Sequence, residues 1–278
     1  MKIIETFLCG KENNPQTCED GLVLRPHLVA VFDGVTAKGT RLWEGKTSGC
    51  YAKCVLEEYL QGEVEKQDAV ELLQNLDHIL REAVMRTGEK LKCEEYPRAA
   101  IILYNDFYKE IWAYGDCQCR INGEVYTHSK KIDELNADLR AYYLEYQLMQ
   151  ADAGMEMLAQ NDVGRQAIQQ NLLMQFAFEN KPGSFGYLVL NGMGIEESMI
   201  RRYPVQPGDT VALASDGYPV LGADLQECEA RLAQLMREDP LCFRAYRSTK
   251  GRKDGNVSFD DRAYCRLVVE EERKSQHR

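Results

Sequence analysis

The chain of 278 residues is 44% hydrophobic and long enough to bury a large core. Its formal net charge is −10, and Lys and Arg are dispersed along it, which argues against nucleic acid as a partner. No run of about 18 apolar residues occurs, so we expect no membrane span.

The first third of the sequence alternates short apolar runs with polar or glycine residues, a pattern typical of strands. We predict three neighbouring strands, at residues 3–8, 21–24 and 28–32. Two helices are expected next, at about 43–60 and 68–90. The second has apolar residues spaced for one buried face, so both helices should pack on a sheet.

The middle of the chain first continues the strand pattern. Four strands are predicted, at residues 99–104, 111–114, 117–121 and 124–127. The last two are joined by Asn122-Gly123, the dipeptide most typical of a tight hairpin turn. We therefore expect an antiparallel meander in this part of the chain.

A helical pattern follows from residue 131 to about 178. It contains one stripe of large apolar side chains, made up of Ile132, Leu135, Leu139, Tyr142, Tyr146 and Met149. Helices inserted between strands at this point would form a flap that faces the substrate.

The last third returns to strands. They are expected at residues 187–190, 198–203, 210–214 and 263–269, with one helix at about 224–237. Runs of strands with segregated helices favour an α+β layered fold over a parallel doubly wound sheet. No Gly-x-Gly-x-x-Gly follows a strand, which argues against a dinucleotide-binding fold.

The domain organisation is expected to be simple. No segment rich in Pro, Gly or Ser divides the chain. We predict a single domain over residues 1–269, with the helical insert at about 131–178 and a charged C-terminal tail at 270–278.

The ten cysteines occur without a secretory signal, because the first apolar run is short and contains Glu5. We therefore expect a cytoplasmic protein with reduced, mostly buried thiols. Cys50 and Cys54 could share a helix face and bind zinc. The absence of Cys-x-x-Cys and the scatter of the four histidines disfavour such a site.

Five aspartates lie where predicted strands begin or end. Asp20, Asp33 and Asp216 are each followed by glycine, which allows a sharp turn and a close approach of the backbone to a ligand. Asp116 lies between two predicted strands, and Asp260 precedes the last one. Any one Asp-Gly pair is more simply explained as turn chemistry, but the set could converge in space.

Convergent carboxylates predict a divalent metal site. Mg²⁺ and Mn²⁺ are hard cations that prefer oxygen ligands, and bunched carboxylates are costly without a cation. Two such ions about 3.5–4 Å apart can clamp a phosphoryl group and lower the pKa of a bridging water.

The aspartates and their surroundings resemble the metal-dependent protein phosphatase family, also called PPM or type 2C serine/threonine phosphatases, and in particular its bacterial members. Five segments match in order and strand context: residues 19–21, 29–34, 113–116 with Arg120, 211–217 and 260–269. The resemblance covers roughly residues 9–269 and implies a four-layer αββα sandwich, in which two antiparallel sheets are flanked by helices.

The resemblance implies a role for each matching residue. Asp33 would bridge two metal ions, with the carbonyl of Gly34 as a ligand of one of them. Asp20 would hold one ion directly or through water, with Glu19 beside it. A hydroxide bridging two Mg²⁺ or Mn²⁺ ions would then attack phosphorus without a covalent phosphoenzyme.

The remaining aspartates would complete the metal shells. Asp216 and Asp260 would bind the second ion, and Asp116, together with Asp216, would hold a weaker third ion. By this resemblance the residues closest to the chemistry are Asp33, Asp20 and Asp216.

The sequence departs from the family pattern at the phosphate-binding arginine. Members of the family commonly carry this arginine shortly before the Glu-Asp pair, where the present chain has Asn-Asn-Pro-Gln-Thr-Cys at residues 13–18. Lys11 could reach the site from a longer loop, and so could Lys250, Arg252 or Lys253. Each of these alone is more simply explained as a solvated loop charge.

A second departure concerns the general acid. Some eukaryotic members have a histidine after the Asp-Gly pair, where this chain has Val35. His27 could substitute, although a lone histidine at a strand start is more often structural. Asp261 stands where Asn is usual, which we interpret as a conservative change.

The predicted function is hydrolysis of phosphoserine or phosphothreonine in proteins, with phosphorylated proteins as partners and no indication of oligomeric state. The alternative is a catalytically weak or silent phosphatase-like module that binds a protein partner, suggested by the missing arginine and the insert. Hydrolysis of a small phosphorylated metabolite would use the same site. A cysteine phosphatase is disfavoured, because Cys242 and Arg247 are one residue short of the Cys-x₅-Arg spacing.

Overall fold

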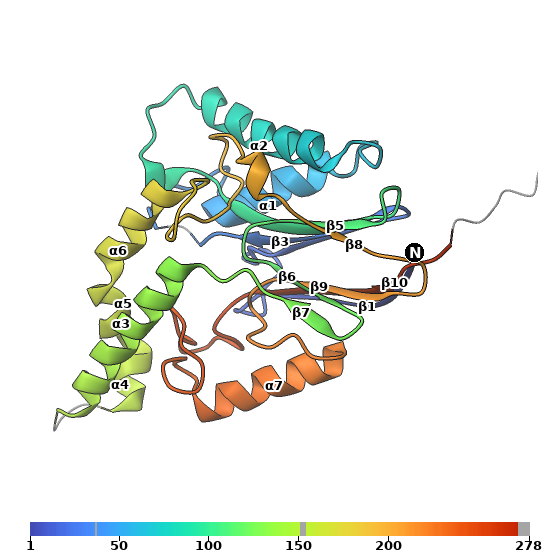
Figure 1. Cartoon of the computed structure of the whole chain (residues 1–278). Coiled ribbons are helices and arrows are strands. Elements are labelled where there is room, and N and C mark those ends of the chain that lie inside the picture. Colours follow the sequence, from blue (N-terminus) through green and yellow to red (C-terminus); the bar gives the residue numbers. More distant parts are fainter. Residues whose placement is uncertain (37, 151–153, 272–278) are drawn as a thin grey trace, which may run out of the picture.

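The computed structural model describes residues 1–36, 38–150 and 154–271, and these form two antiparallel five-stranded sheets packed face to face (Figure 1). The first sheet holds, in order across it, β1 (Lys2–Cys9), β10 (Arg262–Val268), β9 (Thr210–Ala214), β6 (Gln118–Ile121) and β7 (Glu124–Tyr126). The second sheet holds β2 (Gly21–Arg25), β3 (Leu28–Gly34), β4 (Ala99–Asn105), β5 (Glu110–Tyr114) and β8 (Arg201–Pro204).

Helices cover the outer faces of both sheets. α1 (Ser48–Tyr59) and α2 (Ala69–Arg86) lie on the second sheet, and α7 (Leu225–Glu238) lies on the first (Figure 1). α2 contributes one apolar stripe to the core under the second sheet, made up of Leu72, Leu73, Leu76 and Leu80. The expected αββα sandwich is therefore confirmed, and with it the α+β class.

β3 is the strand that positions the site. Ala30 and Phe32 pack against the helices, whereas Val29 and Val31 pack between the two sheets. Because side chains alternate along a strand, Asp33 lies on the same side as Val29 and Val31. The end of β3 is thus fixed by packing on both faces, with its aspartate between the sheets.

Two of the expected strand pairings are wrong. β1 is not a neighbour of β2, because it pairs with β10 in the other sheet. The expected meander stops after β5, which pairs with β8, whereas β6 pairs with β9. Local patterns located these strands correctly but carry no information about partners distant in sequence.

The chain leaves the second sheet at Gly115. This residue has a φ of 127°, in the region that favours glycine, and a Cβ at this position would lie 2.2 Å from the Cβ of Ala100. The close approach to β4 lets the backbone turn sharply between the sheets. Asp116 follows directly in this turn.

Three element boundaries also differ from expectation. The first helix begins at Ser48 rather than near Trp43, because the Thr47 side chain accepts a hydrogen bond from the Cys50 amide at 3.3 Å and caps it. The strand expected at 187–190 is reduced to isolated bridges. The strand expected at 198–203 is preceded by a short 3-10 helix, η3 (Glu197–Met199), and becomes β8.

The segment between β7 and β8 begins with helices that extend beyond one end of the sandwich (Figure 1). They are α3 (Lys131–Leu148), α4 (Met155–Gln160), α5 (Val163–Ala167) and α6 (Gln169–Met174), followed by the 3-10 helix η2 (Gln175–Phe178). We refer to these helices as the inserted helices.

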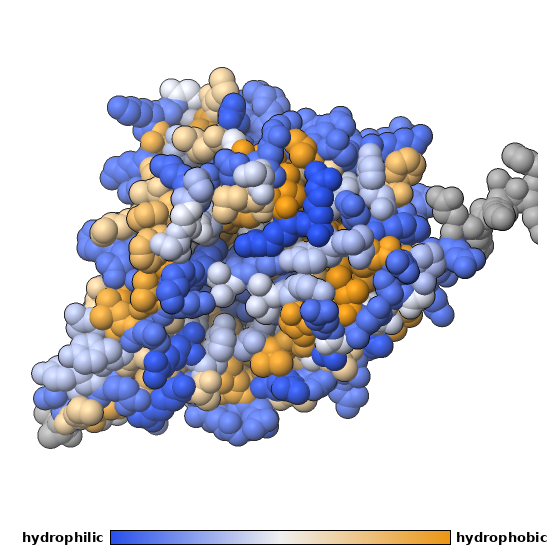
Figure 2. Space-filling view, viewed as in Figure 1, coloured by the Kyte–Doolittle hydropathy of each residue, from blue (hydrophilic) through white to orange (hydrophobic). Residues whose placement is uncertain are grey.

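The apolar stripe expected on the first inserted helix does not face the core. Five of its six members are exposed, from Leu139 at 37% to Met149 at 79%, and apolar surface is visible over the inserted helices in Figure 2. α3 buries a more polar side instead, made up of Asn136, Ala137, Arg140, Ala141 and Leu144. A buried, hydrogen-bonded arginine on that side decides which face packs.

Arg140 joins α3 to the loop before β10. Its guanidinium donates hydrogen bonds to the carbonyl oxygens of Leu241, Cys242 and Ser248 at 2.8–3.0 Å. It also contacts the Asp162 carboxylate at 2.8 Å. One buried side chain therefore connects the inserted helices with the segment that leads to Lys250.

Residues 272–278 of the expected C-terminal tail lie outside the described residues. In the described part of the chain, no helix combines the length and apolar character that a bilayer crossing requires. The ten cysteines are unpaired, and seven of them are buried.

Candidate metal centre

The five aspartates singled out from the sequence come from strand ends of both sheets. Asp33 is the penultimate residue of β3, and Asp20 directly precedes β2. Asp116 lies in the turn after β5, Asp216 lies two residues after β9, and Asp260 lies two residues before β10. The strands run so that all five positions meet at the end of the sandwich beside the inserted helices.

Three of these carboxylates approach one another closely. Asp33, Asp116 and Asp216 each offer an oxygen within 4.8 Å of the others. They line a cavity of about 80 Å³ together with Gly34 and Asp260. Oxygen donors at this spacing suit a hard divalent cation such as Mg²⁺ or Mn²⁺.

The electrostatics of the cluster suit a bound cation. Burial raises the pKa of Asp33 well above its ordinary value, and the neighbouring Asp216 and Asp20 raise it further. Burial and the charges of nearby carboxylates likewise raise the pKa of Asp20, and that of Asp216 to about 7. A bound cation would lower all three, because it favours the ionised form.

Asp20 provides a second indication that these residues fit a metal ion. Its Oδ2 is buried without a hydrogen-bond partner among the described residues. Buried polar atoms are rarely left unpaired in folded proteins. The unpaired oxygen, the three close carboxylates and their all-oxygen chemistry together fit a divalent metal.

Gly34, whose carbonyl is a candidate ligand, lies in a tightly packed position. Its amide donates to the Glu19 carbonyl at 3.1 Å. A Cβ at Gly34 would lie 2.4 Å from that same oxygen and 2.6 Å from the carbonyl oxygen of Gly49 at the start of α1. The packing requires glycine and fixes the backbone next to Asp33.

Lys11 reaches the site but is already engaged. Its Nζ contacts Asp261 at 2.9 Å and Glu19 at 3.1 Å, and it lies 3.8 Å from Asp260. Asp261 also accepts the backbone amide of Lys11 at 2.7 Å. Asp261 stands where the family usually has Asn, and we interpreted this change as conservative. It is not conservative, because the Asp261 carboxylate is the counter-ion of Lys11.

Lys250 is the second of the four suggested cations to reach the cluster, where its ammonium pairs with Asp260. Lys250 and Lys11 hold the pKa of Asp260 below its ordinary value, although burial acts in the opposite direction. Arg252 and Lys253 make no ion pair within the described residues, and Lys253 is exposed.

Lys130 is a site residue that the sequence reasoning missed. Its Nζ lies 2.5 Å from the Asp116 carboxylate and faces the ring of Tyr187. It directly precedes α3 and lies outside every segment of the phosphatase pattern. No local feature marks such a lysine, because only the folded chain brings the start of the inserted helices to the β5–β6 turn.

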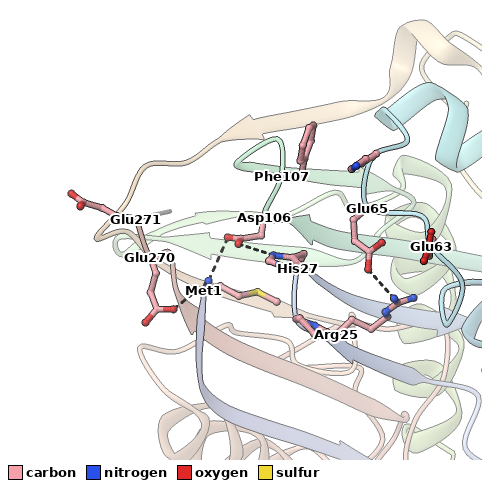
Figure 3. A pocket seen from close by; sticks show the side chains of 11 residues that line it. Met1, Arg25, His27, Glu63, Glu65, Asp106, Phe107, Glu270 and Glu271 are labelled. Carbon is pink, nitrogen blue, oxygen red and sulfur yellow. Dashed lines mark hydrogen bonds and ion pairs between the residues drawn. The ribbon is translucent and has the colours of Figure 1, made fainter. Parts of the chain in front are cut away.

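His27 is not part of the centre, so the suggestion that it could act as general acid is wrong. It directly precedes β3, at the end opposite Asp33, about 20 Å away by the rise per residue of a strand. It pairs with Asp106 at 3.4 Å beside the Met1 amine (Figure 3). A separate surface pocket of about 1010 Å³ opens there.

No family model and no curated protein sequence matches the chain. Solved structures do match. The catalytic domain of the serine/threonine phosphatase PstP, in complex with two manganese ions, is 12% identical with a TM-score of 0.50, covering 97% of this chain and 100% of that one. The PPM phosphatase MsPP from Mycobacterium smegmatis, in complex with cacodylate, is 13% identical with a TM-score of 0.49 and the same coverage. The chain therefore has the fold of the PPM serine/threonine phosphatases.

Proposed function

We propose that the protein is a metal-dependent phosphatase that hydrolyses phosphoserine or phosphothreonine in proteins. The observation that carries the proposal is the approach of the Asp33, Asp116 and Asp216 carboxylates within 4.8 Å of one another. The shared fold supports it, and the five aspartates lie at or next to strand ends. None of the ten cysteines lines the cavity, so a thiolate nucleophile is not part of the proposal.

The proposal assigns Asp20, Asp33, Asp116, Asp216 and Asp260 to the binding of two Mg²⁺ or Mn²⁺ ions, with a third as an extension. Bound ions would supply Lewis-acid polarisation of the phosphoryl group and an activated water. The protein itself fixes the ligands on the ends of packed strands, as Val29 and Val31 do for Asp33.

The dimensions of the site fit a phosphorylated side chain that is attached to a peptide. The cavity of about 80 Å³ is smaller than the roughly 300–1,000 Å³ typical of small-molecule sites. A cleft of about 320 Å³ adjoins it and shares Asp116, Lys130, Asp133, Asp216 and Thr249. The phosphoryl group would enter the cavity, and the adjoining peptide would lie in the cleft.

Phosphopeptide hydrolysis by the purified protein tests the proposal. We expect turnover only with Mn²⁺ or Mg²⁺, and a loss of at least roughly 100-fold in kcat/KM for Asp33→Asn, the range seen when one electrostatic group of an active site is removed. His27→Asn, at the far end of β3, is the matched control and should retain wild-type activity. Turnover that is independent of metal, or unchanged in Asp33→Asn, would contradict the assignment.

A catalytically silent module remains the second candidate, because one structural observation favours it. Three ammonium groups already contact acidic residues of the site: Lys130 on Asp116, Lys250 on Asp260, and Lys11 on Asp261. Such groups could replace part of the positive charge of the metals. Titration calorimetry with Mn²⁺ discriminates the two functions, since an active phosphatase should bind two ions and a silent module one weakly or none.

A further inference from the structure

Four cationic side chains line the small cavity, and two of them lack an acidic partner. Lys130 and Lys250 are paired with aspartates of the cluster. Lys38 and Arg165 also line the cavity, but no carboxylate oxygen of the described residues lies within 4.0 Å of their charged groups. The cavity therefore contains two positive charges that its own carboxylates do not neutralise.

The hydrogen bonds of these two side chains are to neutral groups. Lys38 Nζ donates to the Thr36 carbonyl at 3.1 Å, and Arg165 Nη1 donates to the Thr249 carbonyl at 2.6 Å. These bonds orient both side chains but supply no negative charge to balance them. Each side chain also keeps further N–H donors, since an ammonium has three and a guanidinium has five.

The two cations destabilise each other in the absence of an anion. Burial lowers the pKa of Lys38 to about 7, and Arg165 and Lys250 lower it further, against the opposing effect of Asp133 and Glu19. Burial also lowers the pKa of Arg165. An anion between them would offset this cost, because opposite charges favour the ionised forms.

The inserted helices hold Arg165 in place. The Asp162 side chain caps α5 and accepts the Arg165 amide at 2.7 Å. The same carboxylate contacts Arg140, which is fully buried. Gly164, which directly precedes Arg165, packs closely against Arg140. A Cβ at Gly164 would lie only 2.6 Å from the Arg140 carbonyl oxygen. Arg165 is therefore presented to the cavity from a rigid turn.

We propose that Lys38 and Arg165 bind the phosphoryl oxygens of the substrate, in place of the arginine that is missing before the Glu19-Asp20 pair. Lys11 is not available for this role, since Asp261 and Glu19 occupy its ammonium. Arg165 can offer two parallel N–H donors to a phosphate, and Lys38 adds a point charge. This inference rests on the proposed phosphatase function and adds the inserted helices to its substrate site.

Binding of inorganic phosphate to the full chain, measured by calorimetry with and without Mn²⁺, tests the inference. We expect Lys38→Gln and Arg165→Gln each to weaken phosphate binding roughly 10- to 100-fold, as expected for a lost charge-assisted hydrogen bond. KM for a phosphopeptide should rise in proportion while kcat changes less. Mn²⁺ affinity should stay within about twofold, because neither residue is a metal ligand in the proposal.

Two further variants keep the outcome interpretable. Arg165→Lys retains the positive charge but loses the paired N–H donors of the guanidinium. It should bind phosphate with an affinity between those of the wild type and Arg165→Gln. Arg231→Gln on α7, an exposed arginine paired with Glu227, is the matched control and should behave as wild type. Circular dichroism checks that each variant is folded.

The inference is wrong if folded Lys38→Gln and Arg165→Gln both bind phosphate as the wild type does, or if the wild type binds Mn²⁺ but no phosphate. A wild-type protein that binds phosphate through these residues but takes up no Mn²⁺ would instead contradict the phosphatase proposal. The two failures are therefore distinguishable in one set of titrations.

Discussion

Gly34 and Gly49 lie in contact where the end of β3 meets the start of α1. A Cβ on Gly49 would lie 2.8 Å from the Gly34 carbonyl carbon and 2.8 Å from the Val35 carbonyl oxygen. These neighbours are backbone atoms, which move only if the strand end moves with them. Asp33 is one residue away, so the packing of two glycines sets the position of a candidate metal ligand.

Gly49→Ala should therefore affect both stability and metal binding. We expect a loss of roughly 1–3 kcal/mol in the free energy of unfolding, the usual cost of overpacking, and weaker Mn²⁺ binding. Urea denaturation and calorimetry measure the two effects. Gly154→Ala, where a Cβ would meet no described atom within 4 Å, is the matched control for Mn²⁺ binding. Mn²⁺ affinity that is equal in both variants would show that the glycine contact does not position the site.

Among the individual site residues, the acidic ones could be predicted from the sequence, and most of the basic ones could not. The aspartates are recognisable because each lies beside a strand and three precede glycine, so local pattern and resemblance agree. Lys11 and Lys250 could be suggested from their loops. Lys130 and Arg165 could not, because their place at the cavity depends on how the inserted helices fold back onto the strand ends. Lys38 follows Gly34 by four residues, but nothing in its local sequence distinguishes it from a solvated loop lysine.

Among the secondary-structure elements, α3 shows how a correct helix can be given the wrong orientation. The helical span was predicted from residue 131, and α3 does begin there. Its most apolar stripe, however, is exposed, and the buried side contains Arg140 and Asn136. Hydropathy does not identify this side, because the buried guanidinium is satisfied by carbonyls from a loop about 100 residues away in sequence.

Removal of that guanidinium should be costly. We expect Arg140→Met to lower the free energy of unfolding by roughly 3–5 kcal/mol, since the carbonyls of Leu241, Cys242 and Ser248 and the Asp162 carboxylate lose their partner. Arg247→Met is the matched control. Its ion pair with Asp138 is exposed and should contribute less than about 1 kcal/mol. Denaturation midpoints that coincide for the two variants would refute this account of how α3 is attached.

For the molecule as a whole, the layered architecture was predictable, but the assignment of strands to sheets was only partly so. Short apolar runs bounded by turn residues located nine of the ten strands closely. The sandwich arrangement was predicted from the family resemblance. The position of β1 beside β10 depends on contacts between the two ends of the chain. Strand pairs this far apart leave no local trace, since either sheet could accept an edge strand of this composition.

The buried acidic cluster makes the stability of the whole metal-free protein dependent on pH. Folding raises the pKa of Asp20, Asp33 and Asp216, the last from 3.8 to about 7. Between these values the folded state binds more protons than the unfolded state, so stability is greatest at low pH in this window and falls as pH rises through it. The pKa of Asp260 is lowered, so this residue affects the pH dependence of stability only below about pH 4.

We therefore expect the metal-free protein to lose stability between about pH 5 and pH 7.5, with roughly 3 kcal/mol of the loss due to Asp216 alone. Mn²⁺ at about 100 times its Kd should restore roughly 2.7 kcal/mol at the higher pH. Urea denaturation in the presence of EDTA and of Mn²⁺ measures both effects, and Asp216→Asn should flatten the pH dependence. A wild-type stability that falls no more steeply over this interval than that of Asp216→Asn would contradict the raised pKa of that carboxylate.

The two ends of β3 lie in different surroundings. The pocket beside Met1 and His27 lies at its start, and the aspartate cluster lies at its end. A bead, sensor chip or fluorescent label attached at position 27, whose side chain is 65% exposed, would thus stand about a strand length, roughly 20 Å, from the cavity. Immobilised in this orientation, the protein presents its cleft to the solution. A macromolecule as large as a folded phosphoprotein could then be captured and washed without the support blocking its approach.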